Sequence, residues 1–176
     1  MCTLMLANTG KGQRATGQGQ RARGNGLALM LIACFACGGA GALLSPHERA
    51  ELSRAELRWN ARTFANYSYE IQQSCFCPTE MNAWTRVIIQ GGAVASAVNV
   101  ETGAQVSSEL YHLWFPVDSL FARLHAATKQ PSEAYADIIV TFDSALGFPT
   151  YIEWKEKPNV ADAGAVYRLR NLAPQD

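Results

Sequence analysis

The 176-residue sequence lacks the features from which a function is most readily recognised. A helix that crosses a bilayer needs about 20 consecutive apolar residues, whereas the apolar run Leu27–Cys37 contains eleven. No Ser/His/Asp arrangement stands out as catalytic. Gly91-Gly92 precedes a strand pattern rather than the helix that follows a phosphate-binding loop. The sequence therefore predicts no transmembrane helix and no cofactor, and it favours a protein that is not an enzyme.

Acidic residues are absent before Glu48, and the only charged side chains in that region are Lys11, Arg14, Arg21 and Arg23. The balanced total of 15 Lys and Arg against 15 Asp and Glu hides this asymmetry, because the rest of the chain is acidic overall. Non-specific nucleic-acid binding needs clustered Lys and Arg, so we expect no nucleic-acid partner. The length and the 48% hydrophobic content fit one domain with a packed core.

The N-terminal segment has the layout of a secretory signal peptide. A basic stretch leads into the apolar run Leu27–Cys37, and small residues follow at Gly38–Ala42. The alternative is that this run forms a buried core helix. Its glycine-rich flanks and the preceding positive charge favour a signal peptide over residues 1–33, and hence export from the cytoplasm.

Leu31-Ile32-Ala33-Cys34 resembles the lipobox of bacterial lipoproteins, in which the cysteine is diacylated and becomes the first mature residue. Two acyl chains suffice for stable anchoring. This resemblance predicts lipid attachment at Cys34, a Gly/Ala-rich tether over residues 34–44 and a membrane-anchored protein of the cell envelope, facing the periplasm or the exterior. The alternative is cleavage near Gly39–Ala42, which would give a soluble exported protein.

The remainder, residues 45–176, reads as a single α+β domain. Ser45-Pro46-His47-Glu48 predicts a capped helix start, and this helix should run from Pro46 to about Ala65. A second helix should begin after Pro116, where apolar residues recur at helical spacing. The strand patterns lie at Tyr67 to Gln72, Trp84–Gln90, Ala93–Glu101, Tyr135–Asp143, Thr150–Glu156 and Ala165–Leu172, and residues 104–115 are ambiguous, with a possible sheet extension at Leu110–Phe115.

The order of these elements is helix, three strands, helix, three strands. We therefore expect an antiparallel sheet of five to six strands with two helices packed on one face, because that arrangement buries one side of every element.

Cys75-Phe76-Cys77-Pro78 is the one local motif that indicates chemistry. A structural disulfide fits an oxidising compartment, and it would join Cys75 to Cys77 or one of them to Cys37. In a regular strand, residues i and i+2 lie near the upper limit for a disulfide, so a bulge or turn would be needed. The other interpretations are a redox-active dithiol, a metal site that uses these thiols, and two reduced, buried side chains.

An ordered set of motifs extends from about Trp59 to Leu172. It comprises Trp59, Asn66-Tyr67-Ser68-Tyr69, Cys75-Phe76-Cys77-Pro78, the hairpin at Gly91-Gly92-Ala93-Val94, Val117-Asp118-Ser119-Leu120-Phe121, Asp143 with Leu146-Gly147-Phe148-Pro149, and Tyr167-Arg168-Leu169. With these motifs the chain resembles a bacterial family of lipoproteins known only as domain of unknown function 6174. The resemblance implies a cell-envelope address and no known activity. Asp143 either binds a cation or organises its turn; such sequences often carry Asp where this chain has Trp154, which weakens the cation hypothesis.

Two functional hypotheses follow from the sequence. The first is a lipid-anchored envelope module, without catalytic activity, that binds an unidentified envelope protein or small ligand or has a structural role. The second is a thiol redox or metal-handling envelope protein that uses Cys75 and Cys77.

Overall fold

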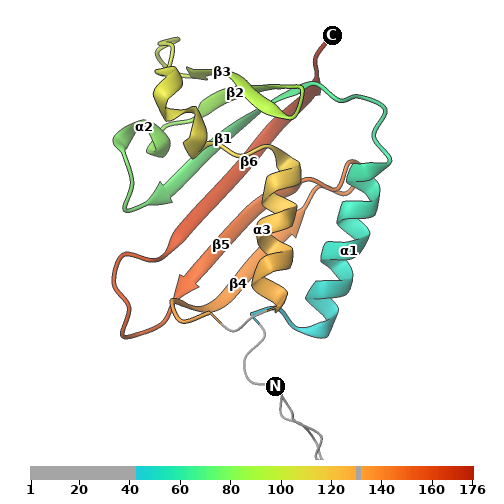
Figure 1. The fold of residues 1–176 in the computed structure, drawn as a ribbon, viewed down its shortest axis with the longest axis vertical. Helices are drawn as coiled ribbons and strands as arrows, with labels where there is room; N and C mark the ends of the chain where they lie inside the picture. Colours follow the sequence, from blue (N-terminus) through green and yellow to red (C-terminus); the bar gives the residue numbers. More distant parts are fainter. Residues whose placement is uncertain (1–42, 130–131) are drawn as a thin grey trace, which may run out of the picture. The chain divides into compact units, whose positions relative to one another are not determined.

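The computed structural model describes residues 43–129 and 132–176 (Figure 1). The predicted signal peptide over residues 1–33, the predicted lipid-attachment residue Cys34 and Cys37 lie outside the described residues. Leu43 and Leu44, which the sequence places at the end of the tether, are buried among the core residues. In the described part of the chain, no helix is both long and apolar enough to cross a membrane.

Helix α1, Pro46–Asn60, begins with the predicted capping box. The Ser45 hydroxyl accepts a hydrogen bond from the Glu48 amide at 3.3 Å, and the Glu48 carboxylate accepts one from the Ser45 amide at 2.7 Å. These two bonds satisfy amides that have no partner within the helix. The helix ends at Asn60 rather than near Ala65, so its predicted C-terminus was too late.

Two side chains beyond Asn60 fold back onto the last turn of the helix. Arg62 donates a hydrogen bond to the carbonyl oxygen of Trp59 at 3.0 Å, and the Phe64 ring packs edge-on against the Trp59 ring. Both contacts accompany the departure from helical geometry after Asn60.

The six strands form one fully antiparallel sheet with the order β3-β2-β1-β6-β5-β4. This arrangement confirms the predicted α+β class. The N-terminal strands form one half of the sheet and the C-terminal strands the other, and the last strand, β6, pairs with β1 at the centre (Figure 1). The strands are β1 Tyr67–Cys75, β2 Thr85–Gln90, β3 Ala93–Asn99, β4 Tyr135–Phe142, β5 Pro149–Glu156 and β6 Ala165–Pro174.

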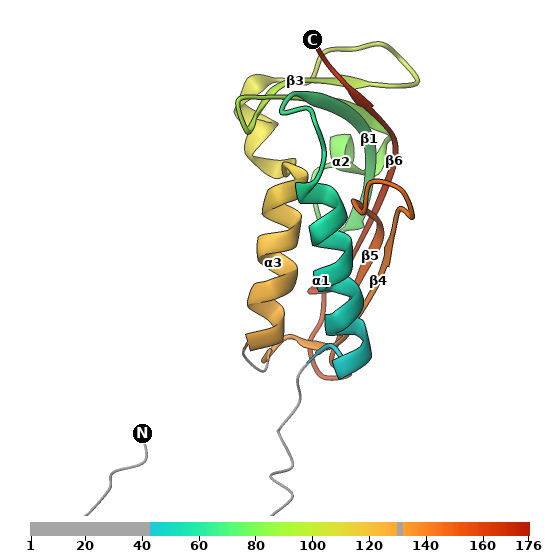
Figure 2. The ribbon, with the colours of Figure 1, turned by 90° about the vertical axis from the view of Figure 1, so that its right-hand side faces the viewer.

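Helices α1 and α3 lie side by side on one face of the sheet, as predicted (Figure 2). Helix α3, Val117–Lys129, buries an apolar stripe that includes Leu120, Phe121 and Leu124. Two tyrosines of β1 hold the start of α3: the Tyr67 hydroxyl accepts a hydrogen bond from the Val117 amide at 2.8 Å, and the Tyr69 hydroxyl donates one to the Phe115 carbonyl at 2.6 Å. Burial raises the pKa of Tyr67 to about 12, so this hydroxyl stays protonated near neutral pH.

Two short helices join these elements, namely α2, Thr79–Asn82, and the 3-10 helix η1, Ser108–Leu113. The predicted sheet extension at Leu110–Phe115 is therefore wrong. Ser107 accepts hydrogen bonds from the Glu109 amide through its side chain and from the Leu110 amide through its carbonyl, which starts the 3-10 helix. This turn places Trp114 in the core, with 2% of its surface exposed.

Candidate functional site

The two cysteines of the Cys-Phe-Cys-Pro motif form a disulfide at the end of β1. The sulfurs of Cys75 and Cys77 are 2.01 Å apart, and their Cα atoms are separated by 5.2 Å. Strand β1 ends at Cys75, so the chain turns there and shortens the separation that a continuing strand would impose. The structure therefore brings together the two candidate residues that the sequence singled out.

This disulfide closes a ring of only three residues. In the chain-entropy account, such a ring stabilises the folded state by about 1.6 kcal/mol, against about 3 kcal/mol for a 15-residue loop. Because the two cysteines are only two positions apart in the sequence, this disulfide stabilises the folded state only weakly. The position of the ring therefore says more about a candidate binding surface than its contribution to stability does.

Phe76, between the two cysteines, points into solvent with 86% of its surface exposed. Among the described residues, Leu57 on α1 is the other large apolar side chain with high exposure, at 70%. The flanking cysteines are half-buried, and Cys77 packs against the core. The ring thus holds an aromatic side chain outward while its base is fixed to the domain.

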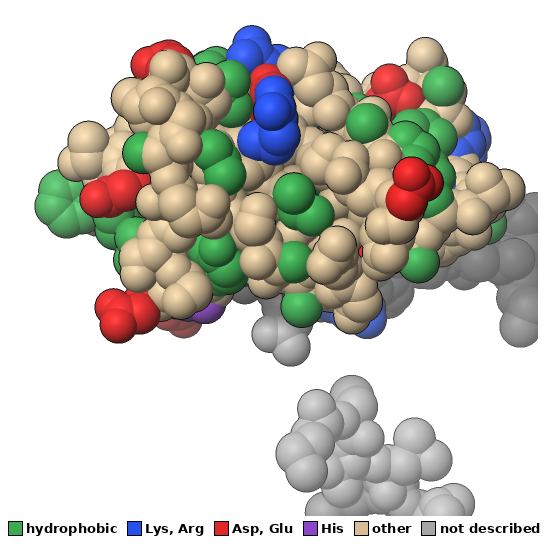
Figure 3. Space-filling model, turned by 90° about the horizontal axis from the view of Figure 1, so that it is seen from above, with side chains coloured by type: hydrophobic (Ala, Val, Ile, Leu, Met, Phe, Trp, Pro, Cys, Tyr) green, Lys and Arg blue, Asp and Glu red, His purple; other side chains and the backbone are tan. Residues whose placement is uncertain are grey.

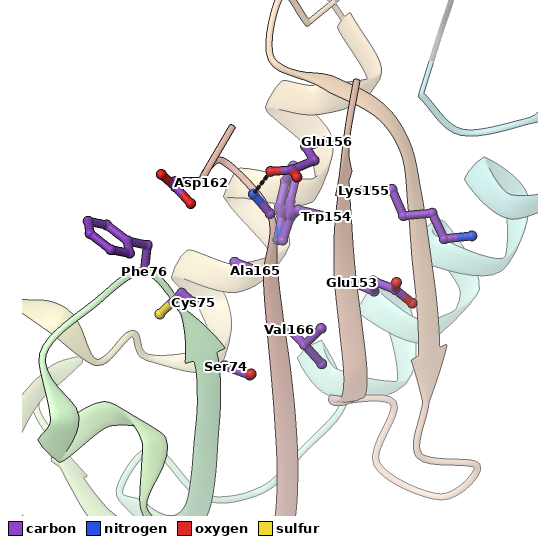
Figure 4. A pocket seen from close by; sticks show the side chains of 11 residues that line it. Ser74, Cys75, Phe76, Glu153, Trp154, Lys155, Glu156, Asp162, Ala165 and Val166 are labelled. Carbon is purple, nitrogen blue, oxygen red and sulfur yellow. Dashed lines mark hydrogen bonds between the residues drawn. The ribbon is translucent and has the colours of Figure 1, made fainter. Parts of the chain in front are cut away.

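Beside this ring lies a groove with a volume of about 590 Å³. Its floor is a row of side chains from three strands, Ser74 of β1, Val166 of β6 and Glu153 of β5, which are aligned by the strand register. Phe76 and Asp162 stand at one side and Lys155 at the other, with the helices behind the sheet (Figure 4). The groove therefore opens on the face of the sheet that α1 and α3 leave uncovered.

The groove carries more acidic than basic groups. Glu153 accepts a hydrogen bond from the Tyr151 hydroxyl at 2.8 Å, which raises the pKa of that tyrosine. Glu156 accepts from the Ala163 and Gly164 amides at 3.0 Å each and so fixes the loop that precedes β6. Together with Asp162 these make three carboxylates, whereas Lys155 is the one lysine or arginine among the lining residues and lies 3.7 Å from Asp137. The groove favours neutral or cationic groups over anions.

Two histidines of the described domain have partners that do not line the groove. His125 Nε2 is 2.7 Å from a carboxylate oxygen of Glu56, and His112 Nδ1 is 2.7 Å from the Glu109 carbonyl oxygen. Across residues 43–129 and 132–176, no group of three or more His, Cys, Asp or Glu side chains is placed to hold a metal ion.

Asp143 organises the turn between β4 and β5. Its carboxylate accepts hydrogen bonds from the Ala145 amide at 3.0 Å and the Leu146 amide at 2.6 Å. Trp154, at the position where a second carboxylate was considered, is buried with 7% of its surface exposed and packs on Tyr135 with ring centroids 5.2 Å apart. The turn role of Asp143 is therefore the one that its contacts support.

The sequence did not reveal that Glu70 is buried on the uncovered face of the sheet, with 4% of its surface exposed. Its two carboxylate oxygens accept hydrogen bonds from Arg86, Arg170 and Asn171, each at 2.9 Å. The register shift between Ser68 and Glu70 lets both Arg170 and Asn171 reach the same oxygen.

Burial raises the pKa of Glu70, but these three hydrogen bonds outweigh burial and hold its pKa below the usual value. Arg170 also stacks on the Trp84 ring, 3.7 Å from its centroid. Figure 3, which views the molecule from above, shows Lys and Arg side chains beside an acidic one at one edge of the view. We interpret the cluster as a structural link between β2, β1 and β6, because every oxygen of the carboxylate is paired within the domain.

Comparison with known proteins identifies a family but no activity. No curated protein and no solved structure matches this chain. The sequence profile of one family matches residues 51–174, a span that contains the disulfide, the groove and all six strands. The chain therefore belongs to the family of unknown function DUF6174, as its motifs predicted.

Proposed function

We propose that this protein is an exported cell-envelope protein, anchored to the membrane by acyl chains on Cys34, whose domain binds a protein or small ligand over the groove beside Cys75 and Cys77. The leader supports export, because its basic stretch, short apolar run and small residues are typical of signal peptides. A disulfide within the domain is compatible with an oxidising compartment outside the cytoplasm.

The observation that carries the binding role is the outward position of Phe76. A solvent-exposed phenylalanine forgoes roughly 1.5–3 kcal/mol of burial free energy, and this one borders a groove of about 590 Å³. Because its backbone is enclosed in a covalent ring at the end of a strand, little conformational entropy is lost when it contacts a partner. Rigid aromatic side chains of this kind are the usual anchors of binding surfaces.

The lipid anchor at Cys34 is tested by the intact mass of the mature protein and by membrane fractionation. A cut before Cys34 with acyl chains on that residue gives a predictable mass. The Cys34→Ser variant should leave the membrane fraction, whereas the matched variant Cys37→Ser should stay. Retention of Cys34→Ser in the membrane would refute the lipid anchor.

The binding site is tested by native mass spectrometry of the full-length protein extracted gently from its own membrane. A co-purifying mass should accompany the wild-type chain, disappear in Phe76→Ala and persist in Leu57→Ala, the matched change at the other exposed apolar side chain. A bound mass that survives Phe76→Ala would exclude Phe76 as the residue that holds the ligand. The lack of any bound mass in the wild type would contradict the proposed binding site.

A further inference from the structure

We infer that the Cys75–Cys77 disulfide exchanges with the dithiol of a protein that docks on Phe76. The inference rests on the docking role proposed for Phe76 and names the partner class, but it does not depend on the lipid anchor. Three properties of the ring carry it: its weak contribution to the fold, its position at the end of a ladder and its surroundings.

A disulfide that cycles between two redox states must leave the domain folded in both. The three-residue ring constrains the unfolded chain only slightly, so its opening removes little stability. Cys75 is also the last residue of β1, and its partner Ala165 is the first of β6. Opening the ring therefore frees the loop at residues 76–78 without interrupting the ladder between β1 and β6.

The two sulfurs differ in their surroundings, which indicates where a nucleophile attacks. Cys75 lines the groove, whereas Cys77 packs against the core. In addition, Cys77 Sγ lies 3.4 Å from the carbonyl oxygen of Cys75, within hydrogen-bond reach once Cys77 becomes a thiol. Attack at Cys75 with release of Cys77 is the direction that this arrangement favours.

The exchange runs in two displacements. A thiolate of the partner attacks Cys75 Sγ, a new S–S bond forms, and the electron pair of the old bond leaves with Cys77 Sγ, which takes a proton from water. The partner's second thiolate then attacks its own sulfur in the mixed disulfide and expels Cys75, which is protonated in turn. The partner's dithiol loses two electrons and two protons, and the two cysteines gain them.

The acidic groove and the exposed Phe76 favour reaction of the disulfide with a protein dithiol over reaction with a small anionic thiol. Glutathione carries a net negative charge, and the carboxylates of Glu153, Glu156 and Asp162 in the adjacent groove repel it. An exposed Phe76 instead offers an apolar contact that a protein with an apolar rim around its dithiol can cover.

The test compares two reductants on the oxidised full-length protein under native conditions: thioredoxin as a protein dithiol and dithiothreitol as a small uncharged one. Free thiols are counted by acid quench, alkylation and mass measurement, and near-UV circular dichroism reports the fold. Both reductants should open the ring without loss of the near-UV signal. Phe76→Ala should slow reduction by thioredoxin about tenfold and change the dithiothreitol rate less than about twofold, while Leu57→Ala should change neither.

The possible failures are distinguishable. If the ring opens only in step with loss of the near-UV signal, the disulfide is purely structural and the exchange is overturned, although ligand binding at the groove is untouched. If thioredoxin reduces the wild type and Phe76→Ala at the same rate, docking on Phe76 during the exchange is overturned, whereas the binding site proposed above is decided by native mass spectrometry of the same variant.

Discussion

Replacing Gly147 with alanine tests how the turn between β4 and β5 packs against α1. Gly147 has a φ of +81°, and a Cβ atom built there would lie 2.1 Å from the Ala55 carbonyl oxygen and 3.0 Å from Arg58 Cβ. Gly92, in the hairpin between β2 and β3, has a similar φ of +78° but no heavy atom within 4 Å of the corresponding position. The two glycines therefore share a backbone conformation and differ in their surroundings.

The expected magnitudes follow from this difference. The left-handed conformation costs an alanine roughly 1–2 kcal/mol at either position. At Gly147 the backbone of α1 must also move, and overpacking of this kind costs about 1–3 kcal/mol more. We expect Gly92→Ala to lower the free energy of unfolding by about 1–2 kcal/mol and Gly147→Ala to lower it by about 2–5 kcal/mol.

Urea unfolding of both full-length variants, followed by tryptophan fluorescence, measures these changes. Equal m-values would show that the unfolding transition is unchanged, so that the two midpoints can be compared directly. Equal losses of stability in Gly147→Ala and Gly92→Ala would refute the packing of this turn on Ala55. A larger loss at Gly92 would refute the reasoning from the two environments altogether.

Three further predictions concern the disulfide, the start of α3 and Glu70. Cys77→Ser should lower the free energy of unfolding by about 1.6 kcal/mol or less. A loss above about 3 kcal/mol in thermal unfolding would show that the disulfide stabilises the fold strongly. Tyr67→Phe should cost about 1–3 kcal/mol in urea unfolding, because it leaves the buried Val117 amide without an acceptor; a neutral effect would mean that water replaces the hydroxyl. Because the folded-state pKa of Glu70 lies below its ordinary value of 4.5, its ionised form adds stability above that value, and this contribution is lost as pH falls through the folded-state pKa. Urea unfolding should therefore find Glu70→Gln less stable than the wild type at pH 7, with the gap closing toward pH 3; a gap that is constant with pH would contradict the linkage.

Elements that depend on nearby residues were predictable from the sequence. The capping box at Ser45 and Glu48 needs only four residues, and its two hydrogen bonds form as expected. The apolar stripe of α3 and the hairpin turn at Gly91 and Gly92 are local patterns as well, and both are present. Local chemistry decides such elements because their partners lie within one or two turns of chain.

Elements that depend on distant residues were not predictable in the same way. The segment at Leu110–Phe115 is apolar enough for a strand, yet Ser107 starts a 3-10 helix there and Trp114 enters the core. Glu70 alternates with apolar neighbours like any solvent-facing strand residue, whereas its partners Arg86, Arg170 and Asn171 follow 16, 100 and 101 residues later. No pattern within β1 carries that information.

In the candidate site, too, the part that depends on nearby residues was predictable and the part that depends on distant residues was not. The pairing of Cys75 with Cys77 was one of the arrangements that the motif allowed, because both residues lie in one short segment. The groove was not foreseen, since Ser74 and Glu153 become neighbours of Val166 only through the register of three strands. The sequence can thus single out the cysteine pair, whereas the groove beside it depends on how the strands of the sheet pair.

The outward position of Phe76 and the small size of the disulfide ring around it support the proposal that Phe76 contacts another molecule. A domain with a total stability of about 5–15 kcal/mol gains little from a three-residue ring, and it gains nothing from an aromatic side chain left 86% exposed. Were the loop purely structural, a polar residue between the cysteines would serve it better, because a phenyl ring stabilises a fold mainly through burial. Selection for contact with another molecule accounts for both features, since a closed ring limits the freedom lost when Phe76 is covered. This argument fails if Phe76→Ser leaves binding unchanged and raises the thermal stability of the protein, because the ring would then have no role that requires an aromatic residue.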